Sequence, residues 1–188
     1  MSNNLKAKAS ALAKIAKEIS NCSCKKGKIG KAVPGEGNPN AKIIFIGEAP
    51  GKKESETGRP FVGRAGQILR RLIREVGLKE KDVYITSAVK YLPTYVTPKA
   101  SDIKHGRKHL FDQLKVINPK IVVLLGNVAS MAVLDEKFAI AKDHGKIIEK
   151  DGINYFIAYH PAALLHNPKV KIEIEKDFKK LKKLINHG

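Results

Sequence analysis

The sequence predicts an α/β fold: a single domain with a mostly parallel central sheet of about four strands and helices on both faces. Short β-branched runs alternate with longer segments of helical periodicity, and several of these runs end in Gly or a small polar residue. A length of 188 residues suits one domain with a substantial core. We therefore treat 1–188 as one domain, in which 1–30 form an N-terminal helix and turn packed on the body.

The N-terminal half supplies the first elements of this pattern. Apolar residues recur near helical spacing from Leu5 to Ile19 with lysines between them, which predicts an amphipathic helix. The run 42–47 is β-branched and closed by Gly, as is typical of a buried strand. A loop over 48–63 and a helix over 65–76, stopped by Gly77, complete this half.

The C-terminal half repeats the alternation. We expect Ser101 and Asp102 to cap a helix that runs to about Asn118. We expect 146–148 to pair with the last strand through the turn at 151–152. The remaining expected elements are strands at 83–87, 121–125 and 155–158, a helix at 128–134, and a final helix marked by Ile172, Phe178, Leu181 and Ile185.

The charge of the chain points to a polyanionic partner. Lys and Arg number 36 against 18 Asp and Glu, a net charge of +18, and nucleic acid is the commonest soluble polyanion. A merely solvated basic surface is the alternative. No apolar run approaches the roughly 20 residues that span a bilayer, and the lysine-rich start does not resemble a secretion signal. We therefore expect a cytoplasmic protein without a membrane partner. Cys22 and Cys24 are the two cysteines, so no disulfide framework is expected.

Three chemically informative residues follow predicted strands. Glu48 comes after the first strand, Ser87 ends the second, and His160 follows the last. Sites in parallel sheets lie beyond the C-terminal ends of the strands, so we expect these side chains to share one site. Each residue alone could instead have an ordinary structural role, as a solvated loop carboxylate or a structural histidine.

Two longer motifs surround these residues. GEAPG at 47–51, followed by GRPFVGRAG at 58–66, resembles the first motif of the family 4 uracil-DNA glycosylases, and HPAALLHNP at 160–168 resembles their second. The segments 84–90 and 119–126 look like the central strands of that family. The resemblance extends from about Leu12 to Asn167.

The resemblance implies an enzyme that flips uracil out of DNA and hydrolyses its N-glycosidic bond in base excision repair. It implies that His160 donates a hydrogen bond to uracil O2 and that Glu48 orients or activates water, since Ala49 stands where other branches place a catalytic Asp. Phe61 would stack on the base and Leu164 would wedge into the vacated stack, although each could be an ordinary core residue. The implied substrate-binding set is Gly47, Ala49, Pro50, Gly51, Phe61 and Ser87, and the implied DNA-binding set is Lys52, Arg59, Arg64, Leu164 and Lys169.

Two departures from the family bear on cofactor and function. The family binds a [4Fe–4S] cluster through four cysteines, whereas this chain keeps Cys22 and Cys24 and has Tyr91 and about Gly106 at the other positions. We therefore expect no cofactor, no metal, and Tyr91 as a packing substitute. The family also has Asn where Ser87 stands, and one hydroxyl cannot read the uracil edge as an amide does.

These departures leave two alternatives to a monomeric, monofunctional uracil-DNA glycosylase. One is a module that binds uracil-containing or damaged DNA without cutting it. The other is a glycosylase with altered specificity for hypoxanthine, xanthine or mismatched thymine. Covalent capture of DNA by a histidine would need an Arg-rich insertion ending in His, and 91–105 is short and poor in Arg although it ends at His105.

Overall fold

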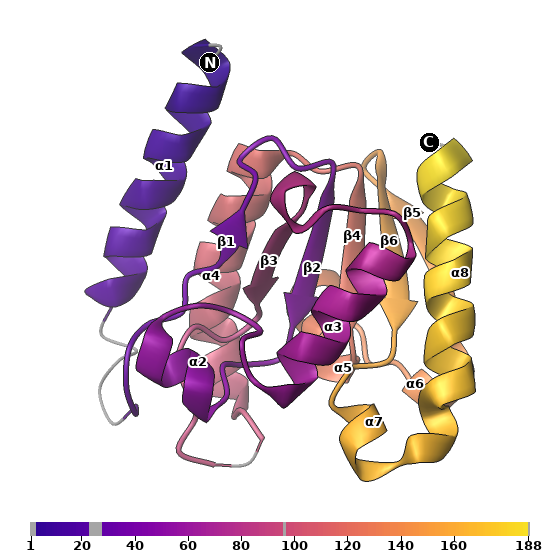
Figure 1. The fold of residues 1–188 in the computed structure, drawn as a ribbon. Helices are drawn as coiled ribbons and strands as arrows, with labels where there is room; N and C mark the ends of the chain where they lie inside the picture. The colour runs from indigo at the N-terminus through magenta and orange to yellow at the C-terminus, as the bar shows by residue number, and fades with distance from the viewer. Residues whose placement is uncertain (1–2, 23–27, 96, 188) are drawn as a thin grey trace.

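A computed structural model describes residues 3–22, 28–95 and 97–187, and these form a mixed sheet covered by helices (Figure 1). Within these residues the sheet has six strands in the order β1-β3-β2-β4-β6-β5. Strand β2 runs parallel to β3 and β4, and β4 runs parallel to β6. The strands are β1 (Glu36–Gly37), β2 (Ile43–Gly47), β3 (Tyr84–Ser87), β4 (Ile121–Leu125), β5 (Ile147–Lys150) and β6 (Ile153–Ala158).

The mostly parallel α/β sheet is confirmed, but four strands is too few. The segment expected to pair with the last strand does so: it forms β5, which is antiparallel to β6. Strand β1 was not expected and lies antiparallel to β3 at the other edge. It is a two-residue strand defined by its partner rather than by its own pattern. That the entire chain, 1–188, folds as one domain stays a prediction.

Alternation along the central strands divides the core into two layers. Ile44 and Ile46 of β2 face one apolar cluster with residues of α1 (Asn3–Ser20), α4 (Ala100–Ile117) and α5 (Asn127–Leu134). Ile43 and Phe45 face a second cluster with residues of α3 (Arg64–Glu75) and α8 (Lys171–His187). Successive side chains of a strand point to opposite faces, so a strand covered on both sides is apolar throughout. Figure 1 shows α3 and α8 in front of the sheet and α4 and α5 behind it.

The helices differ from expectation mainly at their starts and in the loops. Helix α4 begins at Ala100 with Lys99 as its N-cap, so Ser101 and Asp102 lie inside the first turn, where the Asp102 carboxylate accepts the Lys99 N–H. The expected loop 48–63 contains a short helix, α2. The helices are α1 (Asn3–Ser20), α2 (Lys52–Thr57), α3 (Arg64–Glu75), α4 (Ala100–Ile117), α5 (Asn127–Leu134), α6 (Ile140–Asp143), α7 (Ala163–His166) and α8 (Lys171–His187), with 3₁₀ turns η2 (Glu80–Asp82) and η3 (Pro168–Val170).

Helix α1 packs on the body through the apolar stripe that its sequence predicts. Leu12, Ile15 and Ile19 are buried. The Tyr91 hydroxyl donates to the carbonyl oxygen of Ile19 at 2.7 Å, and Lys8 donates to the carbonyl oxygen of Ile117 at 3.0 Å. Cys24 lies outside the described residues. Among the helices that the structure describes, none has both the length and the apolar composition to cross a bilayer.

The sheet brings the chemically informative residues to one edge. Gly47 pairs with Ser87 in the register of β2 and β3. Glu48, the residue after Gly47, therefore leaves the sheet at the same level as Ser87. Strand β6 ends at Ala158, two residues before His160, and points in the same direction. In Figure 1 this edge is the lower one, where the arrowheads of the parallel strands end. The fold thus delivers the loops after β2, β3 and β6 to a common place.

Candidate active site

A cavity of about 420 Å³ opens at this edge of the sheet. It is formed by the loop after β2, the N-terminus of α3, the end of β3 and the loop after β6. Its lining residues are Ala49, Pro50, Gly51, Lys52, Lys53, Glu54, Phe61, Gly63, Arg64, Ala65, Gly66, Ser87, His160, Ala162 and Leu165. Most of the predicted substrate-binding residues therefore meet in one place, together with His160, Lys52 and Arg64.

Other predicted site residues do not line the cavity. Gly47 ends β2, and Glu48 is the next residue in the chain. Arg59 forms a bidentate ion pair with Glu36, at 2.8 and 3.0 Å, and so faces the β1 edge. Leu164 is half-buried against the cluster that contains α3 and α8, and its neighbour Leu165 lines the cavity instead. Lys169 is exposed in η3. The roles given to these residues stay predictions.

Phe61 is held in the cavity by close contact with two glycines. It has a left-handed backbone, with φ of 52°, and its ring lies 5.8 Å from the His160 ring. A Cβ on Gly47 would lie 2.4 Å from Phe61 Cζ, and one on Gly66 would lie 2.0 Å from the Phe61 carbonyl oxygen. Any side chain at either position would displace Phe61, so these glycines fix where the aromatic ring stands.

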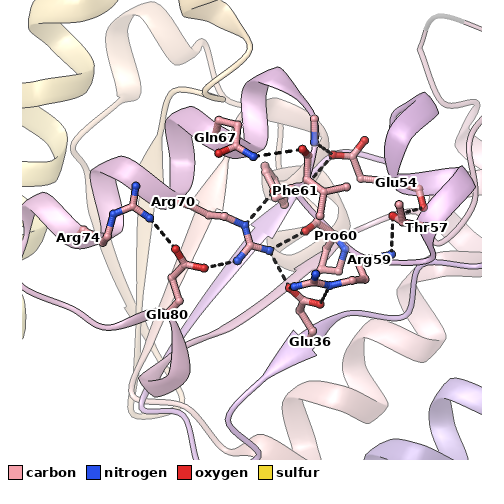
Figure 2. A network of polar contacts seen from close by, with 12 residues as sticks. Glu36, Glu54, Thr57, Arg59, Pro60, Phe61, Gln67, Arg70, Arg74 and Glu80 are labelled. Carbon is pink, nitrogen blue, oxygen red and sulfur yellow. Dashed lines mark hydrogen bonds and ion pairs between the residues drawn. The ribbon is translucent and has the colours of Figure 1, made fainter.

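Glu54 and Arg70 fix the backbone on either side of Phe61 (Figure 2). One carboxylate oxygen of Glu54 accepts the N–H groups of Val62 and Gly63, both at 2.8 Å. Gly63 is the N-cap of α3, so the carboxylate also sits at the positive end of that helix. The Arg70 guanidinium donates to the carbonyl oxygens of Phe61 at 3.0 Å and Pro60 at 3.1 Å.

Arg70 is itself held between two carboxylates. It donates to Glu36 at 2.7 Å and to Glu80, and Figure 2 shows its guanidinium between these two side chains. Burial opposes ionisation of Glu36, but the hydrogen bonds from Arg59 and Arg70 outweigh it and lower the pKa of that carboxyl. Glu36, Arg70 and Glu80 could not be recognised from the sequence, because their three segments meet only in the folded chain. The Glu54 carboxylate likewise acts on backbone groups eight and nine residues further along the chain.

The contacts of His160 define its protonation state. The backbone N–H of Ala162 donates to His160 Nδ1 at 3.1 Å, so the ring proton resides on Nε2. Burial lowers the pKa of His160 to about 4, which leaves the imidazole neutral near pH 7. Nε2 lies toward Gly47, since a Cβ built there would be 3.5 Å from it. The cavity therefore contains a neutral imidazole whose remaining donor points toward the loop that carries Glu48.

Glu48 and Ser87 offer their side-chain oxygens without an internal partner. The Glu48 backbone is fixed, because its carbonyl oxygen accepts the Val89 N–H at 3.0 Å. Across the described ranges, neither the Glu48 carboxylate nor the Ser87 hydroxyl has a hydrogen-bond partner. Burial raises the pKa of the Glu48 carboxyl. Ser87 is 3% exposed and lines the cavity, so its hydroxyl is available to a ligand there.

No grouping of three His, Cys, Asp or Glu side chains close enough to share a metal ion is found at this cavity among the described residues. The one grouping of three metal-ligating side chains found among them is Glu18, His109 and Asp112, which lies between α1 and α4. The cavity offers a hydrogen-bond donor, an aromatic ring and cationic side chains, and the Glu48 carboxylate belongs to the residue that directly precedes the lining residue Ala49. This set suits an anionic or polar heterocyclic substrate.

Comparison with known proteins relates the chain to one family. Residues 34–186 match the family model described as the uracil DNA glycosylase superfamily. The type-4 uracil-DNA glycosylase of Sulfurisphaera tokodaii is 42% identical over 93% of this chain and 84% of its own length. The corresponding proteins of Saccharolobus solfataricus and Archaeoglobus fulgidus are 42% and 37% identical, over 92% and 86% of this chain and 85% and 88% of their own lengths. On this similarity and this fold, the chain belongs to the uracil-DNA glycosylase superfamily.

Proposed function

We propose that this chain removes uracil from DNA by hydrolysing the N-glycosidic bond, which leaves an abasic site. The relatives from Sulfurisphaera tokodaii, Saccharolobus solfataricus and Archaeoglobus fulgidus, which match over most of its length, are type-4 uracil-DNA glycosylases. The observation that carries the proposal is the neutral His160, which keeps its Nε2 proton in a cavity beside the buried ring of Phe61.

The reaction begins with extrusion of the nucleotide into the cavity. A stacked base is out of reach of any side chain, and a cavity of about 420 Å³ has the size of small-ligand sites. Phe61 stacks on the base, and Leu164 enters the vacated stack, with Leu165 nearby on the same short helix. Lys52, Arg64 and Lys169 bind phosphates, and Arg59 assists once its pair with Glu36 opens.

Bond cleavage places negative charge on the departing uracil and positive charge on the sugar. His160 donates its Nε2 proton in a hydrogen bond to uracil O2, a kind of contact worth roughly 3–4 kcal/mol in comparable anion-binding sites. Glu48 stabilises the cationic sugar and orients the attacking water, as carboxylates do in glycoside hydrolysis. Burial raises the pKa of this carboxyl.

Ser87 determines how strictly the base edge is read. Its hydroxyl presents one short group where an amide would present a donor and an acceptor together. Discrimination among deaminated bases then depends on Ser87 together with backbone groups of the loop after β2. Uracil is the proposed substrate, and hypoxanthine or xanthine is the second candidate that this substitution favours.

The residues present do not fit the iron–sulfur cluster that the family resemblance implies. The chain has two cysteines, and a cubane cluster takes four ligands. Tyr91 is 2% exposed and bonds the Ile19 carbonyl oxygen, so it fills the third position. A Cβ on Gly106 would lie 2.0 Å from the Ala88 carbonyl oxygen, so no side chain fits the fourth. We propose that packing and the nearby Lys28–Asp102 ion pair hold the region around Tyr91 and Gly106 in place of a cluster. Purified protein should then contain no stoichiometric iron. About four irons per chain would contradict this.

One chain supplies every group in this scheme, so we expect a monomer that acts on cytoplasmic DNA. The test uses labelled single- and double-stranded oligonucleotides carrying uracil, hypoxanthine, xanthine or a T·G mismatch, followed by alkali. Strand breakage at uracil, lost in Glu48→Ala and His160→Ala but kept in the exposed control His166→Ala, supports the proposal. Tight binding without breakage would identify a non-catalytic module instead.

A further inference from the structure

Helices α1 and α4 bring three side chains that can bind metal close together, and none of the three lines the cavity described above. Glu18 lies near the end of α1, and His109 and Asp112 lie three residues apart on the facing side of α4. One ligand atom from each lies within 4.8 Å of the other two. The three groups therefore span the junction between α1 and the body of the fold.

His109 carries a polar atom that protein groups leave unsatisfied. The side chain is 5% exposed, and its Nδ1 is buried without a hydrogen-bond partner among the described residues. A buried donor or acceptor left unpaired is costly, so native structures seldom keep one without a reason. The neighbouring histidine on the same helix face behaves differently, because His105 Nδ1 contacts the Ser101 carbonyl oxygen at 2.9 Å.

The surroundings of His109 leave room for water. A hollow of about 970 Å³ adjoins Glu18 and His109 and gives access from solvent. Lysines line this hollow, and the carboxylates of Glu18 and Asp112 lie where they would offset the charge of a divalent ion.

We propose that Glu18, His109 and Asp112 bind a zinc ion that ties α1 to α4. An imidazole nitrogen and two carboxylate oxygens are zinc ligands, and water from the hollow completes a tetrahedral set. Bonds of about 2.0–2.2 Å place ligand atoms roughly 3.4 Å apart, so a small movement of the exposed Glu18 closes the site. The spacing in sequence gave no sign of this site because its ligands come from separate helices.

Zinc binding to chelator-treated protein, measured by calorimetry, tests the proposal, with thermal melting as a second readout. We expect one zinc per chain and a melting temperature that rises with zinc concentration. His109→Asn and the half-buried Asp112→Asn should each weaken zinc binding at least about tenfold, as loss of one ligand does. His105→Asn, which alters the same hollow without touching the ligand set, should bind zinc like the wild type.

The cysteines provide the decisive control, since thiolates also bind zinc. In a Cys22→Ser/Cys24→Ser protein, zinc binding and its loss in Asp112→Asn should persist. Wild-type protein that binds no zinc at about 100 µM would overturn the proposal. So would zinc binding that survives both ligand variants, or that disappears in the cysteine variant. None of these readouts depends on uracil excision.

Discussion

Replacing Glu54 tests how the Phe61 loop is held. The carboxylate accepts two N–H groups at 2.8 Å and is 9% exposed, so Glu54→Ala removes two charge-assisted hydrogen bonds together. Hydrogen bonds to charged groups are worth about 1.5–3 kcal/mol each, and water recovers part of that loss at the start of α3. We expect Glu54→Ala to lower the free energy of unfolding by about 3 kcal/mol.

The conservative variant separates charge from hydrogen bonding. Glu54→Gln keeps an acceptor oxygen but loses the charge at the helix N-terminus, so we expect a loss of about 1 kcal/mol. Glu56→Ala, on the exposed side of the same short helix, should stay within about 0.5 kcal/mol of the wild type.

Urea unfolding gives the free energy of unfolding of each variant, and uracil excision by the same preparations gives kcat/KM. Because Phe61 lies next to Val62 and Gly63, we expect kcat/KM to fall in the order wild type, Glu54→Gln, Glu54→Ala. A Glu54→Ala protein that loses less than about 1 kcal/mol, or that loses stability without any change in kcat/KM, would refute this reasoning.

Further predictions follow from the glycine contact and the shifted pKa values. In Gly47→Ala the new Cβ meets Phe61 Cζ at 2.4 Å, so the ring moves and kcat/KM falls about tenfold to a hundredfold, measured with uracil oligonucleotides. Burial raises the pKa of Glu48, so the acid limb of a pH–rate profile should lie above the ordinary glutamate value of 4.5 and disappear in Glu48→Ala. The folded pKa of His160 is about 4 against 6.5 when unfolded, so stability falls as pH drops below 6.5, by about 1 kcal/mol at pH 5.5 in urea titrations, and His160→Asn lacks this loss. Burial lowers the pKa of Lys90 to about 7, so unfolding free energy should rise between pH 7 and 10 in the wild type and stay flatter in Lys90→Met.

The central sheet could be predicted because its strands carry their own signal. Strands β2 and β4 are buried along their whole length, and a strand buried on both faces must be apolar and β-branched. Strand β1 consists of Glu36 and Gly37 and gains its strand character only by pairing with β3. Helix α2 is a short polar segment without apolar periodicity, so nothing in its own sequence distinguishes it from a loop.

The gathering of the motif residues around one cavity was predictable, because a single loop carries them in series. Ala49, Pro50, Gly51 and Phe61 belong to one motif, and all line the cavity. The support around them was not predictable, because Glu36, Arg70 and Glu80 come from separate segments and meet through tertiary structure. For the same reason the pairing of Arg59 with Glu36 was not foreseen.

The most direct test of the account is the single-turnover rate of uracil release by His160→Gln and Glu48→Gln at pH 7.5. If the neutral imidazole donates to the departing uracil and the carboxylate acts on the sugar and water, each variant should bind uracil-containing DNA like the wild type. Each should then release uracil about a hundredfold to a thousandfold more slowly, the usual effect of removing one such group. A variant of either residue that releases uracil within about threefold of the wild-type rate would contradict the account.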